Sequence, residues 1–271
     1  HDVSGTDSTA SFNTAYGVTA LDAVTTGDKN TVIGYDAGGA LTTGSANTII
    51  GENAGSNGAL TGDDNTVVGK IAGYALTSGH SNTLIGRHAA SALTTGVRNV
   101  ALGMGANDSA ADGENDNIAI GYNAMAAASL AGAEFSVAVG NYTLDALTSG
   151  DNNTAVGYGS GTDLTTASDF VGLGYNAGAN VTSGTHNTFL GSEAGLSVTT
   201  GSRNTILGVA GWNFDTENDN VGIGYNALGG AINGGEYNVA VGNNTLDALT
   251  SGDNNTAVGY NAGTALTTGS E

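Results

Sequence analysis

A five-residue pattern, Asn-Thr-x-aliphatic-Gly, recurs along almost the whole chain of 271 residues. Clear copies run from Asn30 to Gly34 and from Asn82 to Gly86, and each is followed by Leu-Thr-Thr-Gly. The glycine that ends the pattern falls at positions 17, 34, 51, 69, 86, 103, 121, 140, 157, 174, 191, 208, 224, 242 and 259. This spacing is too short for a pair of helices and suits one turn of a β-coil. We therefore expect an all-β fold, a parallel β-solenoid (β-roll) of about fifteen coils of about 17 residues.

Each coil is expected to contain two short strands and two turns. The residue before the repeat glycine is aliphatic in all copies but the first, as in Ile33, Ile85 and Leu190, and we expect it to form an internal ladder. The residue before that varies in size from Gly172 to Phe189, so we expect it to face solvent or a looser second interface. The second strand is expected to add one core residue per coil. The clearest examples are Leu41, Leu76, Leu93, Leu147, Leu164, Val181, Val198, Leu249 and Leu266.

The repeat predicts one array over residues 1–271, with coils from about residue 13 onward. A longer period lies on top of the short one, because the stretch 141–151 recurs 102 residues later as 243–253. We interpret this as a duplicated block of six coils in a fragment or processed product of a longer protein. The coils at about 104–140 and 209–242 are irregular, and irregular loops on a regular scaffold are common places for specific binding.

The charge balance narrows the possible partners. The chain has 25 acidic and five basic residues, a net charge of -20, and neither Cys nor Pro. Such a surface repels phosphate backbones and anionic lipids, so we expect no nucleic-acid partner. The chain has no apolar run of membrane-spanning length, so we also expect no membrane insertion.

The recurring asparagine leaves two interpretations open. Its amide could stack from coil to coil, as amide ladders do in cross-β assemblies. Alternatively, asparagine could be present because it tolerates a left-handed turn conformation.

The stretch from Asn255 to Gly263, followed by Leu266-Thr267-Thr268-Gly269, resembles the head repeats of trimeric autotransporter adhesins. It is also similar to Gly/Asn/Thr repeats of bacteriophage tail fibres that precede an intramolecular chaperone domain. The resemblance covers residues from about 13 to 271, although the coil is longer than is common in adhesin heads. It implies a left-handed β-roll assembled as a homotrimer, located outside the cell, on a cell surface or on a virion.

Two acidic clusters are candidate calcium sites. The first contains Asp112, Glu114 and Asp116, and the second contains Asp215, Glu217 and Asp219. Alternating carboxylates in a turn can place several oxygens around Ca²⁺, which takes six to eight oxygen ligands. The alternative interpretation is a solvated polar turn. Calcium is the one cofactor that the sequence suggests.

Three other surface patterns are open to more than one interpretation. Tyrosines directly follow several repeat glycines and predict a discontinuous stripe for contact with carbohydrate or with a neighbouring protomer. They are Tyr35, Tyr122, Tyr158, Tyr175, Tyr225 and Tyr260. Asp145, Asp151, Asp247 and Asp253 could form carboxylate pairs of the kind used in glycoside hydrolysis, but their duplication favours a structural role. Adjacent threonines in Leu-Thr-Thr-Gly could form an ice-binding face, with one of each pair exposed.

These patterns together favour an extracellular fibrous protein rather than an enzyme. We expect the shaft or head of a surface adhesin or tail fibre that binds a cell-surface glycan or protein ligand. The second interpretation is a self-assembling filament subunit with a mechanical role, and an ice-binding solenoid is a third. The expected partners are further copies of the chain, as a trimer or a filament.

Overall fold

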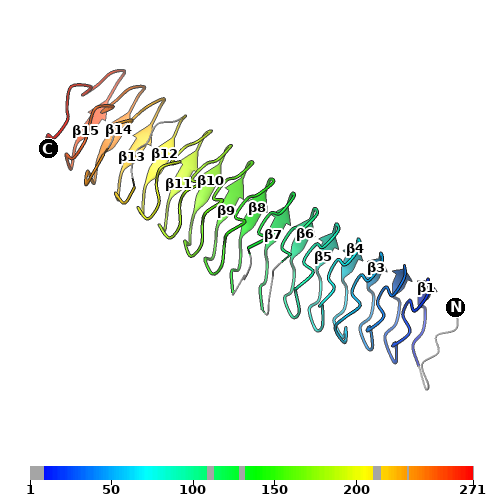
Figure 1. Cartoon of the computed structure of the whole chain (residues 1–271). Coiled ribbons are helices and arrows are strands. Elements are labelled where there is room, and N and C mark those ends of the chain that lie inside the picture. Colours follow the sequence, from blue (N-terminus) through cyan, green and yellow to red (C-terminus); the bar gives the residue numbers. More distant parts are fainter. Residues whose placement is uncertain (1–8, 109–112, 128–131, 210–214, 231, 271) are drawn as a thin grey trace. The chain divides into compact units, whose positions relative to one another are not determined.

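The computed structural model describes residues 9–108, 113–127, 132–209, 215–230 and 232–270. Contacts divide it into two compact units, residues 1–136 and 137–271. Within each unit, every coil contributes one strand of three residues, and turns form the rest of the coil (Figure 1). The first unit contains β1 (Thr14–Tyr16), β2 (Thr31–Ile33), β3 (Thr48–Ile50), β4 (Thr66–Val68), β5 (Thr83–Ile85), β6 (Val100–Leu102) and β7 (Ile118–Ile120). The second contains β8 (Val137–Val139), β9 (Thr154–Val156), β10 (Val171–Leu173), β11 (Thr188–Leu190), β12 (Thr205–Leu207), β13 (Val221–Ile223), β14 (Val239–Val241) and β15 (Thr256–Val258).

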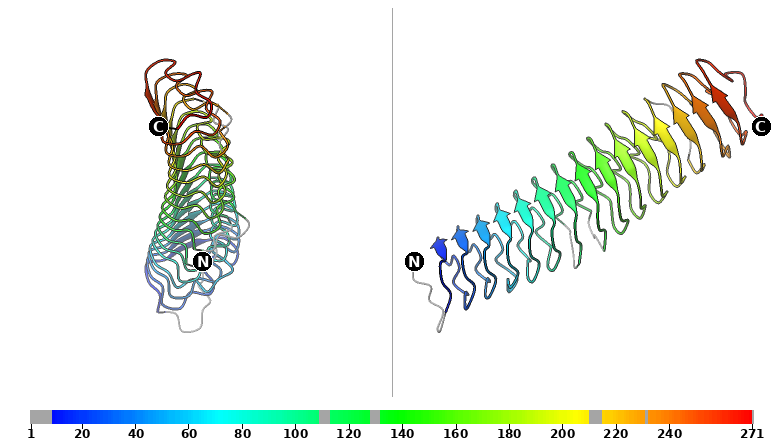
Figure 2. Two further views of the ribbon diagram at one scale, coloured as in Figure 1. Left: turned by 90° about the vertical axis from the view of Figure 1, so that its left-hand side faces the viewer. Right: turned by 180° about the vertical axis from the view of Figure 1, so that it is seen from behind.

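Strands that are neighbours in sequence are also neighbours in the sheet of each unit. They pair in parallel and in register, so that Thr31 lies beside Thr48 and Val171 beside Thr188. The arrows of successive coils accordingly point the same way (Figure 2). The expected parallel β-solenoid is therefore confirmed. The described residues include no helix that could cross a membrane.

The second strand expected in each coil is not present in the described residues. The segment that contains Leu41 consists of turns and bends, and its one bridge joins Leu41 to Leu60. The core residues predicted for this segment are nevertheless correct except in the last coil, because residues such as Leu41, Leu93 and Val181 are fully buried, whereas Leu266 is partly exposed. A side chain can reach the core from a turn when backbone hydrogen bonds to the next coil hold that turn in place. Such a bond runs from Thr42 N–H to Leu60 O at 3.0 Å.

The strand residues face the opposite way from the prediction. In β3, the middle residue Ile49 is fully buried, whereas Ile50 on its C-terminal side is partly exposed. The prediction that the aliphatic residue before the glycine faces the core is therefore wrong, and so is the prediction that the middle residue faces solvent. Strands β2 to β14 all bury the middle residue and turn both flanking residues outward.

The core accepts middle residues of different size because neighbouring coils compensate for one another. Gly172 lies beside the ring of Phe170, and a Cβ at Gly172 would be 2.6 Å from a carbon of that ring. Phe170 and Phe189 are both fully buried and meet edge to face, with ring centroids 5.8 Å apart. Gly172 thus makes room for the ring of Phe170 in its own coil, which packs against Phe189, the partner of Gly172 in the next coil.

A buried asparagine precedes most strands and links each coil to the next. The Oδ1 atom of Asn30 accepts a hydrogen bond from the backbone N–H of Asn47 at 2.9 Å. Its Nδ2 donates to the carbonyl oxygen of Gly44 at 2.9 Å. The same acceptance from the following coil recurs from Asn13 through Asn117 in the first unit and from Asn187 through Asn238 in the second. The amide ladder is therefore the correct interpretation of the recurring asparagine.

The repeat glycine is required by the close stacking of coils. Gly34 has a φ of +140°, which is rarely accessible to other residues. A Cβ at this position would also lie 2.6 Å from the carbonyl oxygen of Gly51 in the next coil. Because the same geometry recurs at the end of each strand, any larger residue would separate the coils there.

Candidate functional site

The outward strand residues make a two-column face in each unit. One column is threonine or a β-branched aliphatic residue, and the other is the aliphatic residue before the repeat glycine. The second column, here called the aliphatic ladder, includes Ile33, Leu102 and Ile223, which are 38%, 42% and 37% exposed. The ladder comprises Ile33, Ile50, Val68, Ile85, Leu102 and Ile120 in the first unit, and Val139, Val156, Leu173, Leu190, Leu207, Ile223, Val241 and Val258 in the second. An apolar side chain in every coil at one place on the surface is typical of an interaction face.

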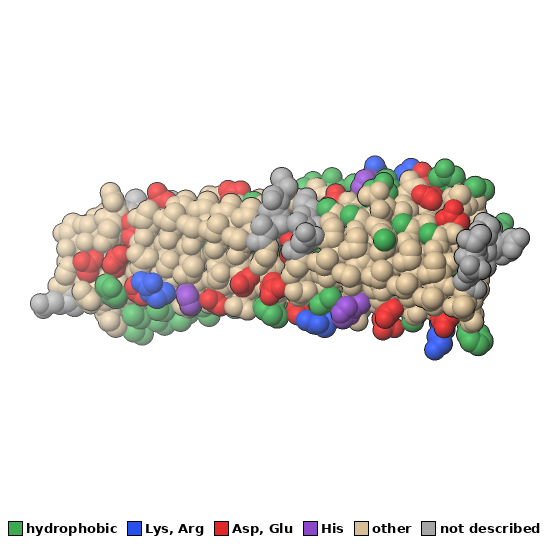
Figure 3. All heavy atoms as spheres, turned by 90° about the horizontal axis from the view of Figure 1, so that it is seen from below, with side chains coloured by type: hydrophobic (Ala, Val, Ile, Leu, Met, Phe, Trp, Pro, Cys, Tyr) green, Lys and Arg blue, Asp and Glu red, His purple; other side chains and the backbone are tan. Residues whose placement is uncertain are grey.

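The adjacent threonines of the turns divide into two roles. The first of each pair donates its hydroxyl to a carbonyl of the next coil, as Thr165 does to Thr182 O at 2.9 Å. The second, such as Thr166, is exposed. The face seen in Figure 3 consists largely of backbone and uncharged side chains, with many charged groups toward its margins.

Several tyrosines of the predicted stripe are exposed, and in the second unit they contact one another. Tyr158 and Tyr175 are about half exposed, and their rings stack with centroids 5.7 Å apart and an interplanar angle of 17°. Tyr142 meets Tyr158 at the same centroid distance but at 74°. Coils that follow one another at strand spacing thus bring their rings into direct contact.

A groove of about 410 Å³ opens beside these tyrosines. Tyr142 and Asp145 reach it from the turn after β8, Tyr158 and Asp163 from the turn after β9, and Asn176 from the turn after β10. Backbone bonds hold the three turns together. Gly159 N–H donates to Asn141 O at 3.0 Å, and Asn176 N–H donates to Tyr158 O at 2.9 Å. The groove is therefore lined by turns that backbone hydrogen bonds hold to one another, and Leu196 from the turn after β11 completes it.

Asp145 in the groove has a raised pKa. Partial burial raises its pKa to about 6, its own backbone N–H lowers the value, and the nearby carboxylate of Asp163 raises it further. Two acids on adjacent coils thus repel each other across the groove. The groove residues include no lysine, arginine or histidine to balance them.

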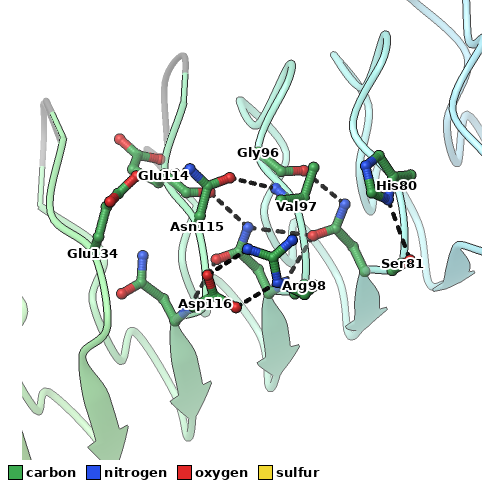
Figure 4. A network of polar contacts seen from close by, with 12 residues as sticks. His80, Ser81, Gly96, Val97, Arg98, Glu114, Asn115, Asp116 and Glu134 are labelled. Atoms are coloured by element: carbon green, nitrogen blue, oxygen red, sulfur yellow. Dashed lines mark hydrogen bonds and ion pairs between the residues drawn. The ribbon is translucent and has the colours of Figure 1, made fainter.

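In the first predicted calcium cluster, Asp116 pairs with a protein cation (Figure 4). Asp116 accepts two hydrogen bonds from the Arg98 guanidinium, both at 2.6 Å, and this contact holds the pKa of Asp116 below its usual value. Glu114 is fully buried. Beside it, Asn115 accepts from Val97 N–H at 3.0 Å and donates to Glu134 at 2.6 Å. Asp112 lies outside the described residues.

The second cluster repeats this arrangement. Asp219 accepts two hydrogen bonds of 2.7 Å from Arg203, which lowers the pKa of Asp219. Glu217 is 3% exposed and accepts from three backbone N–H groups, those of Asp215 and Thr216 in its own turn and of Gly234 in the next coil. Asp215 Oδ1 accepts from the hydroxyl of Thr199.

These contacts give the acidic clusters a structural role. In the described residues, Asp116 and Asp219 pair with arginine, and the buried carboxylate of Glu217 is satisfied by three backbone N–H groups. Within the same part of the chain, no three His, Cys, Asp or Glu side chains converge as a metal site would require. Calcium binding at Asp112, Glu114, Asp116, Asp215, Glu217 and Asp219 stays a prediction.

Of the aspartates considered for glycoside hydrolysis, Asp145 lines the groove and Asp253 does not. Asp253 accepts a backbone hydrogen bond from Glu236 at 2.9 Å. The closest carboxylate neighbour of Asp145 in the groove is Asp163, which the sequence did not single out. The signal that would have found it is the separation of 18 residues, about one coil, between the two acids.

Comparison with protein-family models, with curated proteins and with solved structures gives no match. The class defined by the fold is therefore a parallel β-solenoid repeat protein. Its function has to be argued from its own surfaces.

Proposed function

We propose that the chain is the structural and adhesive part of an extracellular fibre, the shaft or head of a surface adhesin or tail fibre, and that it assembles with further copies of itself. The aliphatic ladder carries the proposal. Fourteen coils keep a large apolar side chain at one outward position, which isolated monomers do not need. A homotrimer is the assembly that the resemblance to adhesin heads implies.

Packing of the aliphatic ladder against other copies would remove this apolar surface from water. Burial of apolar area contributes about 25 cal/mol per Å², so many small contributions along the stack add to a substantial total. The threonines beside the ladder are compatible with such an interface, because short uncharged side chains pack closely. The surface ligand that we propose for the fibre is a glycan or a protein displayed on a cell.

Light scattering combined with size-exclusion chromatography tests the assembly. We expect the measured mass of the wild-type protein to be that of a closed oligomer, with three copies as the number implied by the resemblance to adhesin heads. The double substitution Leu190→Lys and Leu207→Lys should produce the monomer, because charges on adjacent rungs cannot be desolvated in the interface without partners.

The matched control is Ser183→Lys with Thr200→Lys. It adds the same two charges to the exposed turns of the same coils, away from the strand face, and should leave the assembly intact. A wild-type chain that is monomeric at high concentration would exclude the proposal. Open-ended polymers under the microscope would instead favour the filament subunit.

An ice-binding role is a second candidate because of one observation. Threonine occupies the first outward column in many strands, as in Thr31, Thr48 and Thr66, at the strand spacing of about 4.8 Å. A soluble monomer that shows thermal hysteresis would support this candidate over the fibre.

A further inference from the structure

The groove of Tyr142, Asp145, Tyr158 and Asp163 combines aromatic walls with negative charge, and it lies outside the aliphatic ladder. The structure assigns it, we infer, as a binding site for an organic ammonium group, either a quaternary choline-type head group or the primary amine of a lysine side chain or polyamine. The inference goes beyond the proposed fibre function and does not depend on the assembly.

The two tyrosines provide the aromatic part of the site. The rings of Tyr142 and Tyr158 stand 74° apart with centroids separated by 5.7 Å, so they form two walls of a corner. A cation within about 6 Å of a ring centroid is attracted by the electrons of the ring face. The ring of Tyr175 stacks with that of Tyr158 at a centroid distance of 5.7 Å, so Tyr158 is also in contact with the next coil.

The two carboxylates provide the charge. Asp145 and Asp163 come from adjacent coils, and the nearby negative charge of Asp163 contributes to the raised pKa of Asp145. A bound cation would offset the repulsion between the two carboxylates, because both are attracted to it. A neutral sugar would only exchange hydrogen bonds with water and would leave two like charges together.

The size and the remaining lining fit a small head group. A volume of about 410 Å³ lies at the lower end of the range for small-molecule sites. Thr162 and Asn176 add uncharged polar atoms at the edge. Thr162 Oγ1 donates to Gly159 O at 2.8 Å, so its methyl and hydroxyl positions are fixed.

The duplicated block provides a natural comparison within the same unit. The residues 102 positions after Tyr142, Asp145 and Asp163 are Asn244, Asp247 and Ala265. The second copy thus keeps one carboxylate and lacks both the first tyrosine and the second acid. The combination of two rings and two acids belongs to the first copy, which makes Asp247 a matched control position.

Isothermal titration of the whole chain with choline and with n-butylammonium tests the inference. We expect saturable binding at neutral pH. Asp145→Asn and Asp163→Asn should each weaken it at least about tenfold, which corresponds to about 1.4 kcal/mol. Asp247→Asn should leave it unchanged, and unchanged melting of all three variants shows that they fold. The ratio of the two affinities distinguishes a choline head group from a primary amine.

The pH dependence is a second readout. Affinity should fall as the pH is lowered through about 6, because Asp145 takes up a proton and loses its charge. The other titratable groups that line the groove are Asp163 and the phenols of Tyr142 and Tyr158. In Asp145→Asn, the decrease near pH 6 should disappear.

Three results would overturn the inference. One is equal binding of 3,3-dimethylbutan-1-ol, the neutral isostere of choline. Another is saturable binding of neutral oligosaccharides with none of the ammonium probes, which would make the groove a glycan site. The third is the absence of ammonium binding up to about 10 mM, because a weaker site has no useful affinity.

Discussion

The repeat glycines set the distance between coils residue by residue. They have a positive φ near 130–150°, and a Cβ at those followed by another coil of the same unit, such as Gly34 and Gly191, would meet the carbonyl oxygen of the next repeat glycine. A side chain there is opposed both by the backbone conformation and by the neighbouring backbone, which has no flexible end that could move aside. The glycine is therefore fixed by two independent constraints.

Replacement of one of these glycines should destabilise the fold strongly. We expect Gly191→Ala to lower the free energy of unfolding by about 2 kcal/mol or more, because it adds backbone strain of about 1–3 kcal/mol and a steric clash with Gly208. Chemical denaturation measures the change. Ser192→Ala, on the exposed neighbour, should have an effect below about 0.5 kcal/mol. Equal effects at the two positions would contradict the stacking argument.

The three-residue strand is an element with one inward and two outward side chains. In β3, the same residue type occupies both kinds of position, because Ile49 is buried and Ile50 lies in the aliphatic ladder. This pair separates the contribution of the solenoid core from that of the outward face without a change in side-chain chemistry.

Substitution of the pair should give unequal losses of stability. We expect Ile49→Ala to cost about 2–5 kcal/mol, because it leaves a cavity in the core. Ile50→Ala should cost less than about 1 kcal/mol in the monomer. Denaturation at low protein concentration keeps assembly from contributing. If Ile50→Ala were the more damaging, the assignment of the inward residue would be wrong.

The sequence predicts the short strand and its spacing, but not which of its side chains point into the core. Alternation with a period of two is the same whichever set points inward, so Thr31 and Ile33 must share a face, while Val32 must take the other. The uniformity of the aliphatic residue suggested the core. The structure shows that the varied residue is inside because neighbours such as Phe170 and Gly172 compensate for each other in volume, which no single position reveals.

The candidate site was harder to predict for a related reason. Tyr142, Asp145, Tyr158 and Asp163 are brought together by stacking of coils, and the separations of 16 to 18 residues match the repeat only after its register is known. Carboxylates in turns look alike in sequence, whether they bind a cation or pair with protein groups. Only contacts distinguish Asp116, which binds Arg98, from a cation ligand.

The whole molecule carries an excess of 20 negative charges, since 25 acidic residues face only five basic ones. Ion pairs such as Lys70 with Glu52 are exposed and contribute little. The dominant long-range electrostatic effect in the folded chain is therefore repulsion among carboxylates.

Added salt should therefore stabilise the protein. Screening shortens the range of repulsion from about 30 Å at 0.01 M to about 3 Å at 1 M ionic strength. If screening raises the free energy of unfolding by about 1 kcal/mol, the midpoint temperature of unfolding should rise by about 2–4 °C. Thermal unfolding in NaCl and in KCl at neutral pH measures the shift, which should be the same in both salts. A lower midpoint at high salt would mean that the ion pairs outweigh the repulsion.

The hydrogen bonds of the asparagine ladder also affect how the number of repeats can change in the gene. Each Asn30-type side chain bonds to the following coil, so the coils that carry this asparagine offer their successors the same donors and acceptors. Slippage or unequal crossing-over that adds or removes whole asparagine-bearing repeats therefore leaves the bonds at the new junction intact. The 102-residue duplication is such an event preserved in the sequence. The length of the protein can thus change by inheritance in steps of one coil without any new contact having to evolve.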